Sequence, residues 1–448
     1  MTVSSAFEAY FAHGSSQAKS EAIVVYRTPE RSDGAVDGRL EELSMRLDYA
    51  KKRAHIQKPV GEKLVNEYKN ASAKRISSKR PLSGMTIGDG TLPVAVVEVT
   101  RSTLPLLADH PEVAAVMPNQ KIRLIEPRAA GYSNLGKQEA KDRLTWGLKR
   151  LNISALWEIT KGEGSKVAVL DTGVYSQHSA LHDCVEDFIV VDPLGRRVSA
   201  SPMFDSEQHG THVCGTIAGG KTPEGVSIGV APDARLLVAN VLMGQTTLHT
   251  LLEGISWAVE KGANIINMSL GFTYYEPLFC HVFDMLIDEF SIAPIVAIGN
   301  ENHGNTSSPG NARSAVGVGA VGKAGRGLDV AFFSSGASLV FPGETDPMVT
   351  KPDIVAPGVR VYSCIPPQKQ PDGTFEYAYM DGTSMAAPHV SGVMALLMAA
   401  KPAAHVTDII TALKETAIHP KGGGRQFRPD NRWGYGFIRP AEAMKALD

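Results

Sequence analysis

Residues 381–400 read DGTSMAAPHVSGVMALLMAA, a stretch that predicts a helix over residues 383–401. Gly382 permits a tight backbone approach, and Ser384 follows where the helix begins. A hydroxyl at a helix N-terminus feels the positive end of the helix dipole, which favours developing negative charge. Ser384 or Thr383 could equally be a simple cap. The Ala, Ser and Gly positions, with Pro388 in the first turn, indicate close packing rather than capping alone.

Working outward from this stretch, apolar strands and helices alternate from about residue 146 onward. The expected strands cover residues 166–171, 234–242, 263–270, 293–299 and 315–321, and the other expected helices cover 209–219, 248–262 and 281–291. This alternation predicts an α/β fold with a parallel sheet that helices flank on both faces. In such folds the active site lies beyond the carboxyl ends of the strands.

Three further polar residues stand at such positions. Asp171 closes the apolar strand KVAVLD, where it can accept an imidazole N–H or simply form a turn. His209 opens HGTHVCGTIAG and is a better general base than His212, one turn further in, which we expect to be a core histidine. Asn300 follows APIVAIG, where its amide can donate to an oxyanion or serve as a loop residue.

The first 145 residues have a different character. Residues 1–20 are small and polar, and we expect them to be disordered. Residues 21–126 predict a small α+β domain, with strands at 22–26 and 92–100, an amphipathic helix over 38–70 interrupted near Pro59, a short helix at 102–111 and a hairpin or bent strand over 113–126. Residues 127–145 lack periodicity and predict a linker, followed by a domain over 146–448.

The composition indicates a folded protein without a global preference for nucleic acid or membranes, since 43% of residues are hydrophobic, 21% are charged and the net charge is -2. Continuous apolar runs stay shorter than the roughly 18 residues of a transmembrane helix. The N-terminus lacks the pattern of a secretory signal, and the four cysteines form no CxxC pair. We therefore expect buried free thiols and a cytoplasmic location, with secretion as the alternative.

The motifs DTG, HGTHVCGT, NMSLG, AIGN and GTSMAAPHVSG occur in this order, and GVAPDARL, KPDIVAPGV and WGYGFIRPAEA extend the pattern. Residues 146–445 thereby resemble the subtilisin-like serine protease (subtilase) family. The resemblance implies an endopeptidase for protein or peptide substrates in which Ser384 attacks, His209 transfers the proton and Asp171 orients the imidazole. It also implies that Asn300 and the Ser384 backbone N–H hold the oxyanion.

The same resemblance extends to substrate binding and regulation. It implies an edge strand that pairs with the extended substrate, formed by Ser269, Leu270 and Gly271, and a first specificity pocket walled by Ala297, Ile298 and Gly299. Residues 21–126 are similar to the family's inhibitory propeptide. This implies a self-inhibited zymogen, with the N-terminal domain as intramolecular inhibitor and self-cleavage between about Ile125 and Asp142.

The sequence departs from the family pattern at three positions. Secreted relatives carry an acidic calcium ligand where this chain has Ala180, so we expect no metal at this position and no cofactor for the chemistry, with a structural calcium ion as the open alternative. Cys214 replaces a small apolar residue near His209, and we expect it to behave as a buried hydrophobe that makes the enzyme sensitive to mercurials. Phe272 follows Ser-Leu-Gly where relatives often have Gly, and it is expected to narrow the first pocket.

Two other functions stay open at this point. A specialised maturation protease would cut one partner peptide, and a broad substrate screen distinguishes it from a general endopeptidase. A catalytically silent binding or scaffold protein would keep its cleft plugged by residues 1–126. A trimmed chain of ~35 kDa would exclude that last alternative.

Overall fold

The computed structural model describes residues 2–12, 18–27, 43–76, 80–272, 275–340, 348–371, 373–420 and 428–448. Its centre is a nine-stranded sheet in the order β15-β14-β13-β11-β7-β10-β8-β9, with β18 also pairing with β14. These strands are β15 (Gly327–Val330), β14 (Val316–Ala324), β13 (Ala293–Ala297), β11 (Ile265–Met268), β7 (Lys166–Asp171), β10 (Arg235–Asn240), β8 (Val185–Val191), β9 (Arg197–Val198) and β18 (Ile354–Pro357). All pairings are parallel except those of β9 and β15, so the predicted α/β fold is confirmed.

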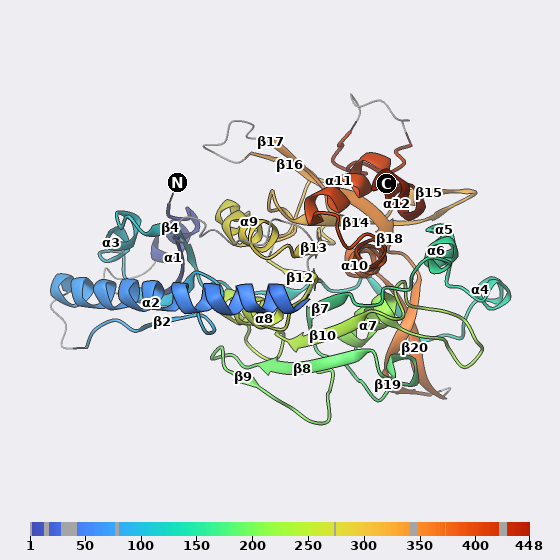
Figure 1. The fold of residues 1–448 in the computed structure, drawn as a ribbon, viewed down its shortest axis with the longest axis horizontal. Helices are drawn as coiled ribbons and strands as arrows, with labels where there is room; N and C mark the ends of the chain where they lie inside the picture. The colour runs from blue at the N-terminus through green and yellow to red at the C-terminus, as the bar shows by residue number, and fades with distance from the viewer. Residues whose placement is uncertain are drawn as a thin grey trace.

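Helices cover both faces of this sheet (Figure 1). Along β7, Val167 and Val169 belong to the core that contains α7 (His209–Ala218) and α10 (Thr383–Ala400). Ala168 and Leu170 face the opposite core, with α8 (Leu248–Glu260) and α9 (Cys280–Asp288). The alternation of side chains along a strand explains this division. By length and composition α10 could cross a membrane, but 89% of it is buried inside the protein as its central helix.

Shorter elements complete the large domain. They are α5 (Trp146–Arg150), α6 (Ile153–Trp157), η1 (Ser179–Leu181), β12 (Leu270–Gly271), η2 (Pro277–Phe279), the β16 (Ala337–Val340) and β17 (Met348–Lys351) pair, the β19 (Val361–Gln370) and β20 (Gly373–Asp381) pair, α11 (Val406–Thr416) and α12 (Pro440–Ala446). The sequence did not predict the two β-pairs, because their partly exposed strands carry few continuous apolar residues.

The N-terminal part forms a four-stranded antiparallel sheet in the order β2-β3-β1-β4. It contains β2 (Gly84–Thr86), β3 (Val94–Val99), β1 (Ser20–Tyr26), β4 (Val113–Pro118), and the helices α1 (Ala6–Ala12), α2 (Leu43–Ile76) and α3 (Leu104–Ala108). One face of this sheet packs on its own helices. The other face contributes Ile23, Val25 and Val94 to the core that holds α8 and α9, so the two parts share one hydrophobic core.

Two sequence expectations for this N-terminal part are wrong. Residues 6–12 are not disordered but form α1, because Phe7 and Phe11 stack at 5.9 Å between ring centroids and bury themselves against the sheet. Pro59 does not interrupt α2, which is continuous over 34 residues. A proline removes one backbone donor, and the packing of buried residues such as Leu64 and Val65 outweighs that loss. Residues 13–17 and 38–42 lie outside the described residues.

The segment that follows β4 crosses the mouth of the large sheet. It contains β5 (Arg123–Leu124), β6 (Ala129–Gly131) and α4 (Lys137–Asp142). β5 pairs with β12, and β6 pairs with β20, both antiparallel. We call residues 123–131 the strap. The predicted linker over 127–145 is therefore partly structured, because β20 pairs with its residues 129–131 and its residues 137–142 form α4.

Candidate active site

Asp171 and His209 meet at the carboxyl end of the sheet. Asp171 ends β7, His209 begins α7, and the imidazole Nδ1 lies 2.7 Å from the carboxylate Oδ1. Both side chains are buried. Burial lowers the pKa of His209, but the charge and the hydrogen bond of Asp171 outweigh it, so the pKa is raised above its ordinary value.

A second carboxylate, Asp205, ties these two elements together. It accepts hydrogen bonds from the backbone N–H of Thr211 (2.7 Å) and from the hydroxyl groups of Thr211 (2.6 Å) and Thr172 (2.7 Å). Thr172 follows Asp171 directly, and Thr211 lies in the first turn of α7. Asp205 therefore fixes the separation of Asp171 and His209. Its role was not predicted, since nothing in the sequence pattern FDSEQHG marks this acid as different from its neighbours.

Two further residues of α7 lie inside the core. They are His212, which we expected to be a core histidine, and Cys214, which departs from the family pattern. His212 Nε2 lies 3.1 Å and 3.2 Å from the carbonyl oxygens of Val361 and Ala378. Burial lowers the pKa of His212 to about 3, so this histidine is neutral inside the core. Cys214 is fully buried, and burial raises the pKa of its thiol. All four cysteines are free thiols, and three of them are buried as predicted, whereas Cys280 is partly exposed.

Ser384 lies in the first turn of α10 and faces the strap. Its hydroxyl donates a hydrogen bond to the carbonyl oxygen of Ile125 (2.8 Å). The Ser269 hydroxyl donates to the Ser384 carbonyl (3.2 Å). Within the described part of the chain, His209 Nε2 has no hydrogen-bond partner. The serine hydroxyl is thus engaged with the strap and not with the imidazole.

Asn300 presents its amide nitrogen to the cleft. Its Oδ1 accepts hydrogen bonds from the Thr383 backbone N–H (3.0 Å) and the Thr383 hydroxyl (2.9 Å). Its Nδ2 donates to the Glu126 carbonyl oxygen (2.8 Å). Thr383 therefore orients the donor of Asn300 and places it beside Ser384. The sequence analysis considered Thr383 only as a helix cap and missed this contact.

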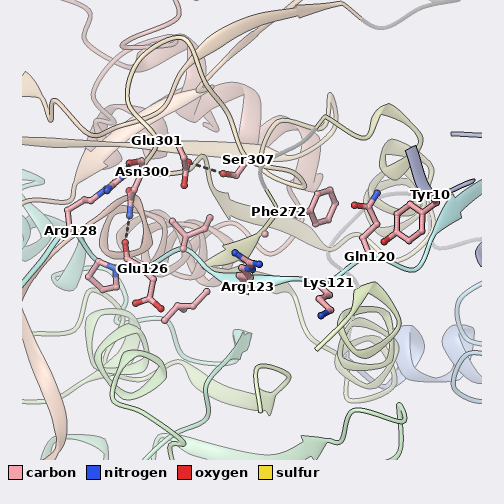
Figure 2. A pocket seen from close by; sticks show the side chains of 14 residues that line it. Tyr10, Gln120, Lys121, Arg123, Glu126, Arg128, Phe272, Asn300, Glu301 and Ser307 are labelled. Atoms are coloured by element: carbon pink, nitrogen blue, oxygen red, sulfur yellow. Dashed lines mark hydrogen bonds between the residues drawn. The ribbon is translucent and has the colours of Figure 1, made fainter. Parts of the chain in front are cut away.

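The strap lies in the cleft like an added strand (Figure 2). The N-terminal part of the strap, up to the residue that contacts Ser384, pairs with an edge strand. Leu124 pairs with Leu270, Arg123 pairs with Gly271, and the Ile125 N–H donates to the Ser269 carbonyl (3.2 Å). These three partners are the predicted edge-strand residues.

On the C-terminal side of the contact with Ser384, Arg128 holds the strap. Its N–H donates to the Asp381 carbonyl (2.7 Å), and its guanidinium donates to the Asn300 carbonyl (2.8 Å from Nε). In Figure 2, the Arg128 side chain points toward Asn300, and a dashed line joins the Asn300 amide to the main-chain carbonyl of Glu126. The strap thus contacts the large domain on both sides of the serine.

A cavity of about 700 Å³ opens beside the strap. Its lining includes Tyr10, Gln120, Gly271, Phe272, Asn300, Glu301 and Ser307. The Glu301 carboxylate accepts hydrogen bonds from the Ser307 hydroxyl (3.0 Å) and the Ser335 hydroxyl (3.2 Å). The cavity wall therefore carries an acidic group, which the sequence analysis did not single out.

The predicted pocket residues Ala297, Ile298 and Gly299 are buried and do not line this cavity directly. Gly299 lies immediately behind it, with φ of +116° and an ideal Cβ position 2.5 Å from the Glu301 carboxylate. A side chain at this position would collide with the cavity wall, which explains the need for glycine. Phe272 lines the cavity together with Gln120 and Tyr10, as Figure 2 shows.

The calcium ligand of the family does not fit at Ala180. Its side chain has no oxygen, and its carbonyl accepts a hydrogen bond from the Gly220 N–H (2.8 Å). Among the described residues, no three or more His, Cys, Asp or Glu side chains are grouped so that they could hold a metal ion.

Known proteins resemble this chain in sequence and in fold. The chain is 34% identical over 295 residues to the thermophilic serine proteinase of Bacillus sp. (strain AK1), which covers 64% of this chain and 64% of that protein. It is 32% identical over 288 residues to subtilisin E of Bacillus subtilis (strain 168), which covers 63% of this chain and 68% of that protein. The first of these matches spans less than two thirds of the relative.

The crystal structure of fervidolysin from Fervidobacterium pennivorans, described as a keratinolytic enzyme related to subtilisin, matches with a TM-score of 0.69. The match has 24% sequence identity and covers 96% of this chain and 61% of that chain, and it shows a shared fold. A family model described as "Subtilase family" matches residues 162–436. Since this match covers more than half of the chain, the protein belongs to the subtilase family.

Proposed function

We propose that this chain is a serine endopeptidase that cleaves peptide bonds through Ser384, His209 and Asp171. The observation that carries the proposal is the strap, which is bound in the cleft in the manner of a substrate. Its Ile125 carbonyl meets the Ser384 hydroxyl, while its Ile125 N–H bonds to the edge strand at Ser269. A peptide chain in this arrangement has its carbonyl carbon next to the nucleophile.

The proposed reaction uses groups of this chain and one water molecule. The Ser384 oxygen attacks the carbonyl carbon, and its proton passes to His209 Nε2, which Asp171 keeps correctly oriented. The oxyanion accepts hydrogen bonds from the Asn300 Nδ2 and from the Ser384 backbone N–H. His209 then returns the proton to the leaving nitrogen as the C–N bond breaks. Water hydrolyses the resulting acyl-enzyme by the same steps and restores Ser384.

The N-terminal domain is proposed to be an intramolecular inhibitor, with the cut between Ile125 and Glu126. Ser384 touches the Ile125 carbonyl, but Asn300 touches the next carbonyl, that of Glu126. Efficient attack requires the nucleophile and the oxyanion donor to act on the same carbonyl group. Ser384 and Asn300 therefore contact two neighbouring carbonyl groups of the strap and not the same one. This offset of one residue makes the strap a slow substrate and an effective inhibitor.

The experiment compares the wild-type chain with Ser384→Ala. We expect the wild type to yield a fragment beginning at Glu126, to react with a fluorophosphonate probe and to cleave peptides, whereas Ser384→Ala stays intact and unlabelled. Ser338→Ala, an exposed serine on β16, is the matched control and should behave as the wild type does. A wild-type chain that neither trims itself nor reacts with the probe after proteolytic removal of residues 1–125 would contradict the proposal and favour the plugged scaffold.

A narrower function, maturation of one partner peptide, is favoured by Phe272, the bulky residue of the catalytic part that lines the cavity. The activated protein should then cleave few sites in a peptide library. General degradation of unfolded casein rules out this narrower function and leaves the endopeptidase proposal intact.

A further inference from the structure

Lys351, the last residue of β17, carries an ammonium group that is completely buried. Its Nζ donates hydrogen bonds to the Ala315 carbonyl (2.7 Å), the Asp353 Oδ2 (2.7 Å) and the more distant Arg313 carbonyl (3.5 Å). Burying a charge is costly unless such partners compensate it. Burial lowers the pKa of Lys351, and the Asp353 carboxylate opposes that shift.

Asp353 connects this ammonium to two further elements. Its Oδ2 also accepts the Gly317 N–H (2.7 Å) at the start of β14, and its Oδ1 lies 2.8 Å from the Lys414 Nζ of α11. Burial raises the pKa of Asp353, but the two ammonium groups outweigh it and hold the pKa below its ordinary value. The carboxylate is thus ionised and forms the centre of the cluster.

The two carbonyl groups bound by Lys351 belong to residues 307–315, which we call the wall loop. At its start, Ser307 lines the cavity beside the strap. The next residue, Ser308, exchanges two backbone hydrogen bonds with Phe272 (2.8 and 2.9 Å). In its middle, Gly310 packs so closely on Ala297 that an ideal Cβ would lie 2.5 Å from the Ala297 carbonyl. Lys351 binds the C-terminal end of the wall loop, and the N-terminal end of the wall loop lines the cavity. The position of the bound end therefore determines the position of the end at the cavity.

The oxygen atoms around Lys351 are two backbone carbonyls and one carboxylate. Such a set of oxygen donors is what Na⁺ or Ca²⁺ binds in proteins. An ammonium on a side chain from β17 occupies the centre of this set in the present protein.

We propose that Lys351 serves as a built-in cation that replaces a metal ion and positions the wall loop of the specificity pocket. Lys351 is a positioning residue, because it acts on substrate through the carbonyl groups of Arg313 and Ala315. The inference rests on the proposed function for its link to substrate, and on the geometry alone for its link to cations.

The first test measures thermal unfolding of the full-length chain in EDTA with rising Na⁺ or Ca²⁺. Lys351→Ala leaves room and removes the ammonium group from these oxygen atoms, so its Tm should fall by about 5 °C or more and then recover as either cation is added. Lys351→Met fills the same space without charge and should stay low at all cation concentrations. The wild type provides the baseline for cation effects elsewhere in the protein.

The second test measures substrate discrimination in the activated protein. Lys351→Ala should change the ratio of kcat/KM between two peptides that differ only in the residue before the cut by roughly tenfold, because the wall loop shifts. Added cation should restore that ratio. Fluorophosphonate labelling of Ser384 in the same variant shows whether the nucleophile stays reactive, so a change in peptide preference is separated from a general loss of activity.

Three outcomes would overturn the inference. The first is that the Tm of Lys351→Ala rises with cation concentration no more than the Tm of the wild type does. The second is that the variant stays unfolded at every cation concentration. The third is that the ratio of kcat/KM for the two peptides does not change. A cation-dependent Tm in a protein that cleaves no peptide and takes up no probe would instead contradict the proposed function, because unfolding is measured without activity.

Discussion

The hydrogen bond between Asp171 and His209 determines the pH range in which the proposed reaction runs. The reaction needs a neutral imidazole, and the pKa of His209 is raised above its ordinary value of about 6.5. Activity is therefore lost as the pH falls through this raised pKa, and we expect an acid limb with a midpoint above about pH 6.5. The profile of kcat/KM against pH, measured on the activated protein, checks this value.

Asp171→Asn tests the cause of that shift. Removing the carboxylate charge should move the acid limb to lower pH and reduce kcat by about 10⁴, because the imidazole loses its orienting partner. Asp187→Asn, a carboxylate on β8 paired with Lys261, is the control and should leave both quantities unchanged. An acid limb that stays in place in Asp171→Asn would show that another group titrates.

Pro127 is expected to maintain the offset of the strap between Ser384 and Asn300. Proline restricts the residue before it, Glu126, to extended conformations, so the Ile125 carbonyl does not turn easily into the Asn300 amide. Pro127→Ala should therefore speed self-cleavage at Ile125–Glu126 severalfold, as followed by intact mass over time. Pro402→Ala, at an exposed position distant in sequence from the strap, is the control. An unchanged rate in Pro127→Ala would mean that another contact limits cleavage.

The sequence predicted the positions of the candidate site residues better than their contacts. Asp171, His209, Asn300 and Ser384 each stand where an apolar strand ends or a helix begins, and the fold brings these points to one edge. The bonds of Thr383 to Asn300 and of Asp205 to Thr172 join residues far apart in the chain or in irregular loops. Periodicity carries no information about such pairs. The catalytic roles stay predictions until the variants are measured.

At the scale of elements, the N-terminus of α8 is capped by the segment that leads into the strap. The Leu248 N–H donates to the Gln120 carbonyl (2.7 Å), and the His249 N–H donates to the Asn119 Oδ1 (2.9 Å). A helix leaves such N–H groups without intrahelical partners, so the inhibitor supplies what the helix lacks. The favourable contact belongs to the inhibited state alone.

Asn119→Ala should therefore weaken retention of the cleaved N-terminal fragment by ~1 kcal/mol, about fivefold in the dissociation constant. The measurement is the rate at which the cleaved fragment separates from the catalytic part on dilution. Asn134→Ala, at an exposed position, should have no effect. Equal retention in the two variants would show that the cap at Asn119 contributes nothing to inhibition.

The first half of α2 contributes a second contact between the domains. Arg53, which is buried, forms an ion pair with the partly buried Glu289, and Arg46 donates to the Ala263 carbonyl (2.6 Å). Removing one partner leaves the other charge with less compensation, at a cost below the about 3–5 kcal/mol of a fully buried pair. Glu289→Gln should accordingly release the cleaved fragment much faster, and Arg53→Met combined with Glu289→Met should recover part of the loss. Additive effects in this double-mutant cycle would contradict a direct pairing.

At the scale of the whole molecule, the alternation of strands and helices was sufficient to predict the central sheet and its two helical layers. The core shared between the N-terminal sheet and helices α8 and α9 was not predicted. The apolar residues of β1 read as a buried strand whichever partner covers them, so the sequence does not reveal that Ile23 and Val25 face another domain. The same ambiguity hid the burial of Phe7 and Phe11.

This shared core predicts that activation costs stability. When residues 1–125 leave, the sheet face that contains Ile23, Val25 and Val94 uncovers helices α8 and α9, and apolar surface returns to water. The separated catalytic part should therefore unfold at a lower temperature than the cleaved but still associated complex, as calorimetry of both forms would measure. Equal unfolding temperatures would show that the interface adds no stability.

The antiparallel pairing of β6 with β20 has a consequence for the onset of activity. Severing the chain after Ile125 frees the inhibitor on one side of the serine, yet β6 and Arg128 stay attached on the other. The new N-terminus at Glu126 then occupies the place where the residues after the cleaved bond of a substrate must bind. The new N-terminal segment of each cleaved molecule thus competes with substrate for this place. The delay before activity depends on how quickly β6 dissociates from β20.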